Sequence, residues 1–202
     1  MAASILYIHG LNSSPASQKA RQLIAAAAQV DLHDRLQVPA LHHHPRQAML
    51  QLEEAIVTLG EPLLVGSSLG GYYATHLAQR HGLRALLINP AVNPHRLFDG
   101  HLGMQRNHYT GEQWQLTESH VHALADLEVP PPVAGARVQV WLQTGDETLD
   151  YRRAETFYQG CTVDVCPGGD HGYQGFAQRL PELFLFAGLE PARCAAIDLA
   201  AL

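Results

Sequence analysis

The sequence predicts an α/β fold with three layers, in which a mostly parallel central sheet lies between helices and carries a small cap insertion. Three observations predict it. Short, continuous apolar runs alternate with segments of helical periodicity along the chain, as in parallel sheets that are covered on both faces. The 202 residues are 47% hydrophobic and only 16% charged, which suits one core of substantial size. A strand pattern also runs into a glycine-rich turn and then a helix at residues 63–81.

In the N-terminal half, apolar residues recur at helical spacing in two stretches, each placed between short apolar runs of strand length. Ser14-Pro15 marks the start of the first helix. The expected elements are a strand at 4–8, a helix from 14 to about 30, a weak strand at 36–38, a helix at 47–59, a strand at 63–66 and a helix ending near His81.

The C-terminal half continues the alternation, with strands at 85–88, 138–143 and 163–166 and helices at 151–158 and 176–187. The stretch from about 92 to 127 departs from it, because Gly103, Gly111 and several polar residues interrupt any periodicity. We expect an insertion here with one or two short helices, lying over the carboxyl edge of the sheet, where active-site lids are found. Residues 1–202 are otherwise expected to form a single domain.

Composition excludes several classes of protein. With 13 Lys and Arg residues against 19 Asp and Glu, the formal charge is −6, which argues against a nucleic-acid partner. No apolar run approaches the about 18 residues of a membrane span, and no secretory signal is visible. The 3 cysteines contain no C-x-x-C pair, which favours reduced thiols. We therefore expect a cytoplasmic protein without a membrane span.

Gly66-Ser67-Ser68-Leu69-Gly70 matches the G-x-S-x-G pattern of a nucleophile elbow. This chemistry needs a serine exposed on a sharp turn between a strand and a helix, and the flanking glycines leave room for that turn. The alternative is an ordinary Gly/Ser-rich turn, but the apolar run before it and the helical pattern after it favour a nucleophile at Ser68.

A serine hydroxyl is a weak nucleophile, so Ser68 needs a base and the base needs an orienting carboxylate. After the strand at 138–143 comes Asp146, and after the strand at 163–166 comes His171 between glycines. The order serine, acid, histidine is that of hydrolases with such an elbow. We predict His171 as the base and Asp146 as the acid. The carboxylates that compete with Asp146 are Glu147, Asp150 and Asp170, the last interpreted as organising its loop.

The oxyanion hole is expected to use two backbone N–H groups. One belongs to Leu69, directly after the serine, and the other to Leu11 in the loop after the first strand. Asn12 and Ser13 are candidates for lining the pocket, although Ser13 or Ser14 is as well explained as a cap of the following helix.

Five segments of the chain together match the pattern of one known family: His9-Gly10, Gly66-Ser67-Ser68-Leu69-Gly70-Gly71-Tyr72-Tyr73-Ala74, Asn89-Pro90-Ala91-Val92, Thr144-Gly145-Asp146-Glu147 and Gly168-Gly169-Asp170-His171. With these segments the chain resembles the small bacterial YqiA/YcfP-type esterases of the α/β-hydrolase superfamily, from the first strand to about Gly188. The resemblance implies an α/β-hydrolase fold, a triad of Ser68, Asp146 and His171, and esterase activity without metal or organic cofactor.

Other features admit simpler interpretations. His42-His43-His44 lacks the spacing and the Cys or carboxylate neighbours of a metal site, so we expect a loop at the pocket mouth or in solvent. Tyr72 and Tyr73 are expected to pack. For Asn89-Pro90 a binding loop and a plain turn remain equally open.

Hydrolysis of a small acyl ester through an acyl-enzyme is therefore the expected function. The alternatives are a thioesterase acting on acyl-CoA or another thioester with the same triad, and a non-catalytic ligand-binding protein on the same scaffold. No metal or cofactor is expected. The sequence leaves open the oligomeric state, the acyl chain length, the leaving group and the docking place of the apolar tail at 191–202.

Overall fold

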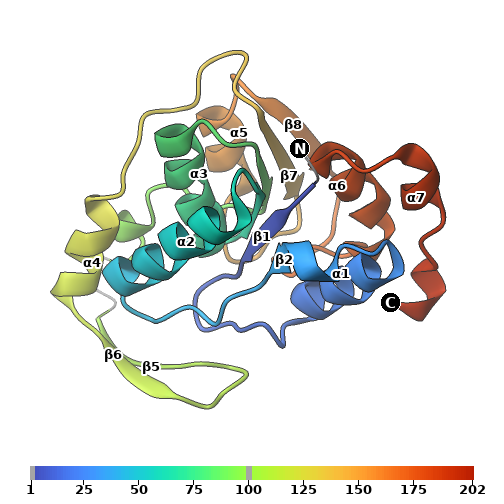
Figure 1. The fold of residues 1–202 in the computed structure, drawn as a ribbon. Helices are drawn as coiled ribbons and strands as arrows, with labels where there is room; N and C mark the ends of the chain where they lie inside the picture. The colour runs from blue at the N-terminus through green and yellow to red at the C-terminus, as the bar shows by residue number, and fades with distance from the viewer. Residues whose placement is uncertain (1–2, 99–101) are drawn as a thin grey trace.

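A six-stranded sheet in the order β2-β1-β3-β4-β7-β8 forms the centre of the molecule (Figure 1). The computed structural model describes residues 3–98 and 102–202. All five pairings within this sheet are parallel. Its strands are β1 (Ile5–Ile8), β2 (Leu36–Gln37), β3 (Leu63–Ser67), β4 (Ala85–Ile88), β7 (Val138–Gln143) and β8 (Thr162–Cys166). The predicted three-layer α/β fold is confirmed, and all six predicted strands match the observed strands to within one residue at either end.

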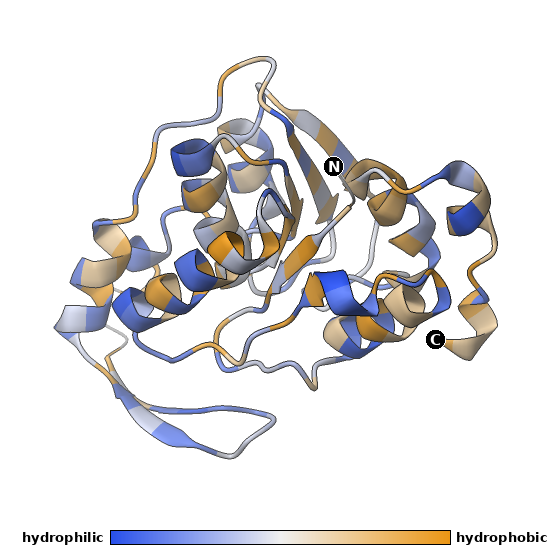
Figure 2. Cartoon of the chain, in the orientation of Figure 1, coloured by the Kyte–Doolittle hydropathy of each residue, from blue (hydrophilic) through white to orange (hydrophobic). Residues whose placement is uncertain are grey.

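Helices cover both faces of the sheet, and each layer encloses its own hydrophobic cluster. Figure 2 shows hydrophobic residues along the central strands and both kinds of residue on the helices, as expected for helices with one buried face. One cluster lies under α1 (Gln18–Gln29), α6 (Leu180–Ala187) and α7 (Pro191–Ala195). The other lies under α2 (Pro45–Leu59), α3 (Leu69–His81) and α5 (Tyr151–Phe157), and includes Leu124 of α4 (Glu118–Ala125). Short 3-10 turns occur at His33–Arg35, Pro94–Arg96, Ala177–Arg179 and Leu199–Ala201.

The predicted insertion differs from expectation in its main element. Residues 92–127 contain a helix, α4, but also an antiparallel hairpin of β5 (Gly103–Arg106) and β6 (Gln113–Leu116), which was not expected from the sequence. The hairpin was missed because its strands are short and mostly polar, and only Trp114 and Leu116 of β6 are buried. Figure 1 shows it extending from the body of the molecule.

Two helices also start later than expected. One is α6, which begins at Leu180 instead of Phe176, after the 3-10 turn at Ala177–Arg179. The first helix begins at Gln18 instead of Ser14, because residues 14–17 form a turn in which the Ser14 hydroxyl accepts a hydrogen bond from the Ala16 N–H.

The apolar tail at 191–202 docks on the body, since Cys194 and Ile197 belong to the hydrophobic cluster under α1 and α6. Within the described ranges, no helix combines the length and the apolar character needed to cross a membrane.

Candidate active site

The turn between β3 and α3 holds Ser68 in a backbone conformation that residues other than glycine rarely adopt, with φ 56° and ψ −122°. Close packing explains the glycines around it. A Cβ on Gly66 would lie 2.4 Å from the Gly70 carbonyl oxygen, and one on Gly70 would lie 2.0 Å from the Ile8 carbonyl oxygen. The G-x-S-x-G pattern therefore reflects three backbones in contact, which fix the serine where β1 and β3 end.

Ser68, His171 and Asp146 come together in one hydrogen-bonded chain. His171 Nε2 lies 3.0 Å from Ser68 Oγ, and His171 Nδ1 lies 2.8 Å and 3.0 Å from the two carboxylate oxygens of Asp146. With the carboxylate beside Nδ1, that nitrogen donates and Nε2 is free to accept the serine proton. The Asp146 side chain is only 2% exposed, whereas that of His171 is 23% exposed and open to a substrate.

The surroundings of Asp146 keep it ionised. Burial alone would raise its pKa, but the hydrogen bonds from His171 and from the backbone N–H groups of Leu149 and Thr148 outweigh burial and hold the pKa below its ordinary value. The competing carboxylates have other partners. Glu147 accepts the backbone N–H of His171, Asp150 accepts the Arg152 N–H at the start of α5, and Asp170 accepts the side-chain amide of Gln174.

Two buried amides, Asn89 and Gln143, hold the loop that carries His171. Asn89 Nδ2 donates to the Asp170 carbonyl at 3.0 Å, and Asn89 Oδ1 accepts the Gln143 N–H at 2.9 Å. Gln143 Oε1 in turn accepts the N–H groups of Asp170 and Gln174. Asn89 therefore has a positioning role that neither of the two interpretations from the sequence, a binding loop or a plain turn, included. The sequence gives no local signal for this role, because its partners lie more than 50 residues away.

The two residues predicted to supply the oxyanion hole, Leu11 and Leu69, belong to segments that adjoin Ser68. Leu69 occupies the first position of α3, where no carbonyl of an earlier helical turn is available to its N–H. Leu11 follows Gly10, and a Cβ on Gly10 would lie 3.1 Å from Ser68 Cβ, so this loop runs against the serine. Leu11 and Leu69 line the same small cavity.

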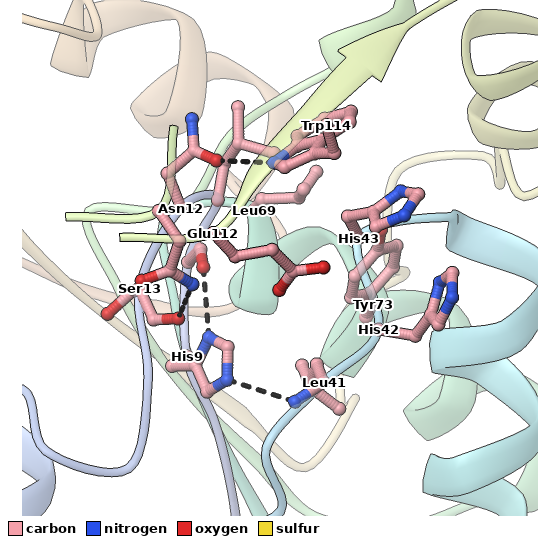
Figure 3. A pocket seen from close by; sticks show the side chains of 13 residues that line it. His9, Asn12, Ser13, Leu41, His42, His43, Leu69, Tyr73, Glu112 and Trp114 are labelled. Carbon is pink, nitrogen blue, oxygen red and sulfur yellow. Dashed lines mark hydrogen bonds between the residues drawn. The ribbon is translucent and has the colours of Figure 1, made fainter. Parts of the chain in front are cut away.

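That cavity, called here the Trp114 cavity, has a volume of about 40 Å³ and is drawn in Figure 3. Its apolar walls are Leu11, Leu41, Leu69, Tyr73 and Trp114. The hairpin closes one side, since Trp114 Nε1 donates to Asn12 Oδ1 and Asn107 Nδ2 donates to the Ser13 carbonyl (Figure 3 shows the Trp114 bond). Asn12 and Ser13 thus line the pocket, as the sequence suggested, and Asn12 also anchors the hairpin.

A second cavity of about 200 Å³, the Lys19 cavity, opens directly on the candidate nucleophile and base. Ser68 and His171 are among its lining residues, together with the first turn of α1 and Tyr109. Gly10, Leu11 and Ser13 line both cavities, so the loop after β1 lies between them.

His9 joins two loops at the edge of the Trp114 cavity. Its Nδ1 lies 3.0 Å from the Gly10 carbonyl and its Nε2 lies 3.2 Å from the Leu41 N–H (Figure 3). Nδ1 therefore carries the proton and Nε2 accepts, and burial lowers the pKa of His9, which keeps the ring neutral.

The His42-His43-His44 run lies at the pocket mouth, as one of its two interpretations predicted. His42 and His43 line the Trp114 cavity, and His44 accepts the Arg46 N–H at the start of α2. His43 stacks on Trp114 with ring centroids 4.7 Å apart, and its Nδ1 lies 3.2 Å from His120 Nε2. Across residues 3–98 and 102–202, no group of three or more His, Cys, Asp or Glu side chains could hold a metal ion.

Tyr72 and Tyr73 are buried packing residues, and the Tyr72 hydroxyl donates to the Leu124 carbonyl at 2.7 Å. Burial raises the pKa of both phenols, so neither ionises near neutral pH. Neither hydroxyl lies in the chain from Ser68 to Asp146.

A parallel sheet with helices on both faces is the fold of the α/β-hydrolases, and solved structures share this fold. Est1E from Butyrivibrio proteoclasticus, in a structure with ferulic acid bound, is 14% identical with a TM-score of 0.66, covering 91% of this chain and 88% of that one. An esterase domain from Rhodothermus marinus is 16% identical with a TM-score of 0.62, covering 92% and 86%.

The chain belongs to UPF0227, an uncharacterised protein family whose model matches residues 4–188. This confirms the resemblance recognised in the sequence. A UPF0227 protein from Shewanella woodyi is 36% identical over 96 residues, which are 45% of this chain and 52% of the relative. The chain thus spans about half the length of the curated relatives that it matches.

Proposed function

We propose that the protein is a serine esterase that hydrolyses small acyl esters through an acyl-enzyme intermediate. The observation that carries the proposal is the continuous hydrogen-bonded chain from Ser68 Oγ through His171 to the buried carboxylate of Asp146. Its members come from three separate strand ends, and they meet at the distances that proton transfer requires. The esterase domain and the ferulic-acid complex among the structural neighbours support an ester substrate.

In the first half of the reaction, Ser68 Oγ attacks the ester carbonyl carbon while His171 Nε2 takes the hydroxyl proton. Asp146 holds the imidazole in the correct tautomer and stabilises its positive charge. The carbonyl oxygen becomes an oxyanion beside the N–H groups of Leu11 and Leu69, at the positive end of α3. When the tetrahedral intermediate collapses, the bond to the alcohol breaks and His171 returns the proton to the leaving oxygen.

In the second half, His171 takes a proton from water, and the resulting hydroxide adds to the acyl carbon. The bond to Ser68 Oγ then breaks, the serine regains its proton from His171, and the carboxylic acid leaves. The chain supplies every proton donor and acceptor that this sequence needs, so the proposal requires no cofactor. A thioester would follow the same steps with a thiolate as leaving group.

A fluorophosphonate probe followed by intact-mass measurement tests the nucleophile. One adduct is expected on the wild-type protein, none on Ser68→Ala, and an undiminished adduct on Ser67→Ala, which removes the neighbouring hydroxyl. An unlabelled but folded protein would overturn the proposal in favour of a ligand-binding role. Rates on matched acetyl and butyryl oxygen esters and thioesters then decide between esterase and thioesterase.

A further inference from the structure

Lys19 is the only lysine in the 202-residue chain, and it lies beside the candidate catalytic residues. It is the second residue of α1 and lines the Lys19 cavity with Ser68 and His171. Its ammonium group donates one hydrogen bond, of 2.7 Å, to the carbonyl oxygen of Gly172. An ammonium group has three N–H donors, so this bond leaves donors for a ligand.

The charge on Lys19 is poorly compensated. Burial lowers its pKa to about 8, although Asp170 and Asp146 act at a distance in the opposite direction. Among the described residues, no carboxylate lies within ion-pair distance of the Lys19 ammonium group. All the ion pairs formed by these residues have an arginine or a histidine as the basic partner. A partly desolvated cation without a counter-ion is costly, and a bound anion offsets that cost.

Ser17 gives a second, independent indication of a ligand. It is the residue before α1, it is only 8% exposed, and it lines the same cavity. Its hydroxyl lies next to that of Tyr7 but has no hydrogen-bond partner of good geometry among the described residues. Its side chain does not cap α1 either. The N-terminal end of this 12-residue helix therefore presents uncapped backbone donors and a buried hydroxyl on the side of the ammonium group.

The position of the cavity indicates which part of a substrate it receives. His171 and Gly172 are among its lining residues, and in the proposed reaction His171 protonates the leaving alcohol. The Trp114 cavity, on the other side of Leu11, is lined by both apolar and polar side chains, including that of Glu112, and has a volume of only about 40 Å³, which suits a short, uncharged acyl chain. The leaving group is thus placed on the side of Lys19.

We infer that Lys19, Ser17 and the first turn of α1 form an anion-binding subsite, and that the substrate is a short-chain ester whose leaving alcohol carries a carboxylate or phosphate group. The inference rests on the proposed esterase function. Carboxylate and phosphate share the chemistry that recognises them here, namely a negative charge with several acceptor oxygens.

The kinetic test compares the acetyl ester of 3-hydroxybenzoate with the acetyl ester of 3-hydroxybenzamide, which has nearly the same shape but no charge. The acetyl ester of 3-hydroxyphenyl phosphate tests the second anion. We expect kcat/KM for the charged esters to exceed that for the amide roughly tenfold, mainly through KM, as for one charge-assisted hydrogen bond. Lys19→Met should abolish this preference and Ser17→Ala should reduce it. Arg21→Met, an exposed change of the same charge on α1, should leave it intact.

Two results overturn the subsite. One is an equal rate on charged and neutral esters in the wild-type protein while the probe still labels Ser68. The other is an equal loss on both esters in Lys19→Met, which would mean that Lys19 only supports the His171 loop through Gly172. A preference for a charge on the acyl side, seen with phenyl succinate against phenyl butyrate, contradicts the assigned orientation.

A binding measurement separates failure of the subsite from failure of the esterase. Lys19 is the only lysine, so its acetylation by an amine-reactive reagent can be followed at this one side chain. Peptide mapping separates it from acetylation of the N-terminal amino group. We expect 3-hydroxybenzoate and inorganic phosphate to slow acetylation of Lys19, in wild type and in Ser68→Ala, and 3-hydroxybenzamide to have no effect. If neither anion protects Lys19, the subsite is wrong whether or not Ser68 reacts.

Discussion

Replacing Asn89 with alanine is expected to destabilise the fold and to weaken the proposed catalysis together, because this buried amide joins the ends of β4 and β7 to the His171 loop. The change removes an acceptor 2.9 Å from the Gln143 N–H and a donor 3.0 Å from the Asp170 carbonyl. Each buried group left without a partner costs about 1–3 kcal/mol, so the two together cost about 2–6 kcal/mol. Against a typical stability of about 5–15 kcal/mol, this is a large loss.

Backbone conformation adds a separate cost that can be measured. Asn89 has a φ of 40°, in the left-handed region, where alanine costs about 1–2 kcal/mol and glycine costs little. Asn89→Gly should therefore recover roughly 1 kcal/mol relative to Asn89→Ala while losing the same hydrogen bonds. Asn93 offers a matched control, since its φ is 50° and its side chain forms no cap bond, so Asn93→Ala should cost only the backbone part.

Urea denaturation gives the stabilities, and ester hydrolysis gives the effect on the site. We expect kcat of Asn89→Ala to fall about 10–100-fold with KM nearly unchanged, because the loop positions His171 without contacting the substrate. If Asn89→Ala is no less stable than Asn93→Ala, or if its kcat equals that of the wild-type protein, the assigned role is wrong.

Three further changes test the site and its surroundings. Gly70→Ala places a Cβ 2.0 Å from the Ile8 carbonyl oxygen, so a loss of folded protein is expected in thermal denaturation; full stability would contradict the close backbone contact. Asp146→Asn should lower kcat about 10³–10⁴-fold, since the amide no longer fixes the tautomer of His171, and retention of activity would shift the acid role elsewhere. Burial and the neighbouring histidines lower the pKa of His120 from 6.5 to about 4. As the pH falls, the His120 imidazole is therefore protonated in the unfolded chain before it is protonated in the folded one. The free energy of unfolding should decrease as the pH drops from 6.5 towards 4, and this decrease should be smaller in His120→Gln.

Much of the site was predictable because its chemistry is tied to local sequence. An apolar run, Gly66 and Gly70 around Ser68, and a helical pattern together specify the elbow, since each can be recognised within a few residues. Asp146 and His171 could be placed at the same edge because parallel strands end together. The structure brings the three side chains within hydrogen-bonding distance, which is what the prediction required.

Contacts between distant segments were not predictable. The hairpin at 103–116 is held by hydrogen bonds from the side chains of Trp114 and Asn107 to the loop after β1. These partners lie more than 90 residues apart in the chain, so no local pattern of residues could indicate the two bonds. The uncapped start of α1 at Ser17 was also hidden, because the sequence indicated Ser13 or Ser14 as the cap of this helix. The significance of Lys19 depends on where α1 lies relative to Ser68, and only the folded chain shows that.

The order of the strands explains why buried amides are needed beneath the candidate triad. Ser68 follows β3 and His171 follows β8, and β4 and β7 lie between these strands in the sheet. Neighbouring strands are about 4.8 Å apart, so three spacings separate β3 from β8 by roughly 14 Å, much more than one imidazole can bridge. The loop after β8 must therefore fold back across β7 and β4. Asn89 at the end of β4 and Gln143 at the end of β7 bind the backbone of this loop where it crosses them. In this view, the polar residues at the two intervening strand ends are as necessary for the position of His171 as Asp146 is for its tautomer.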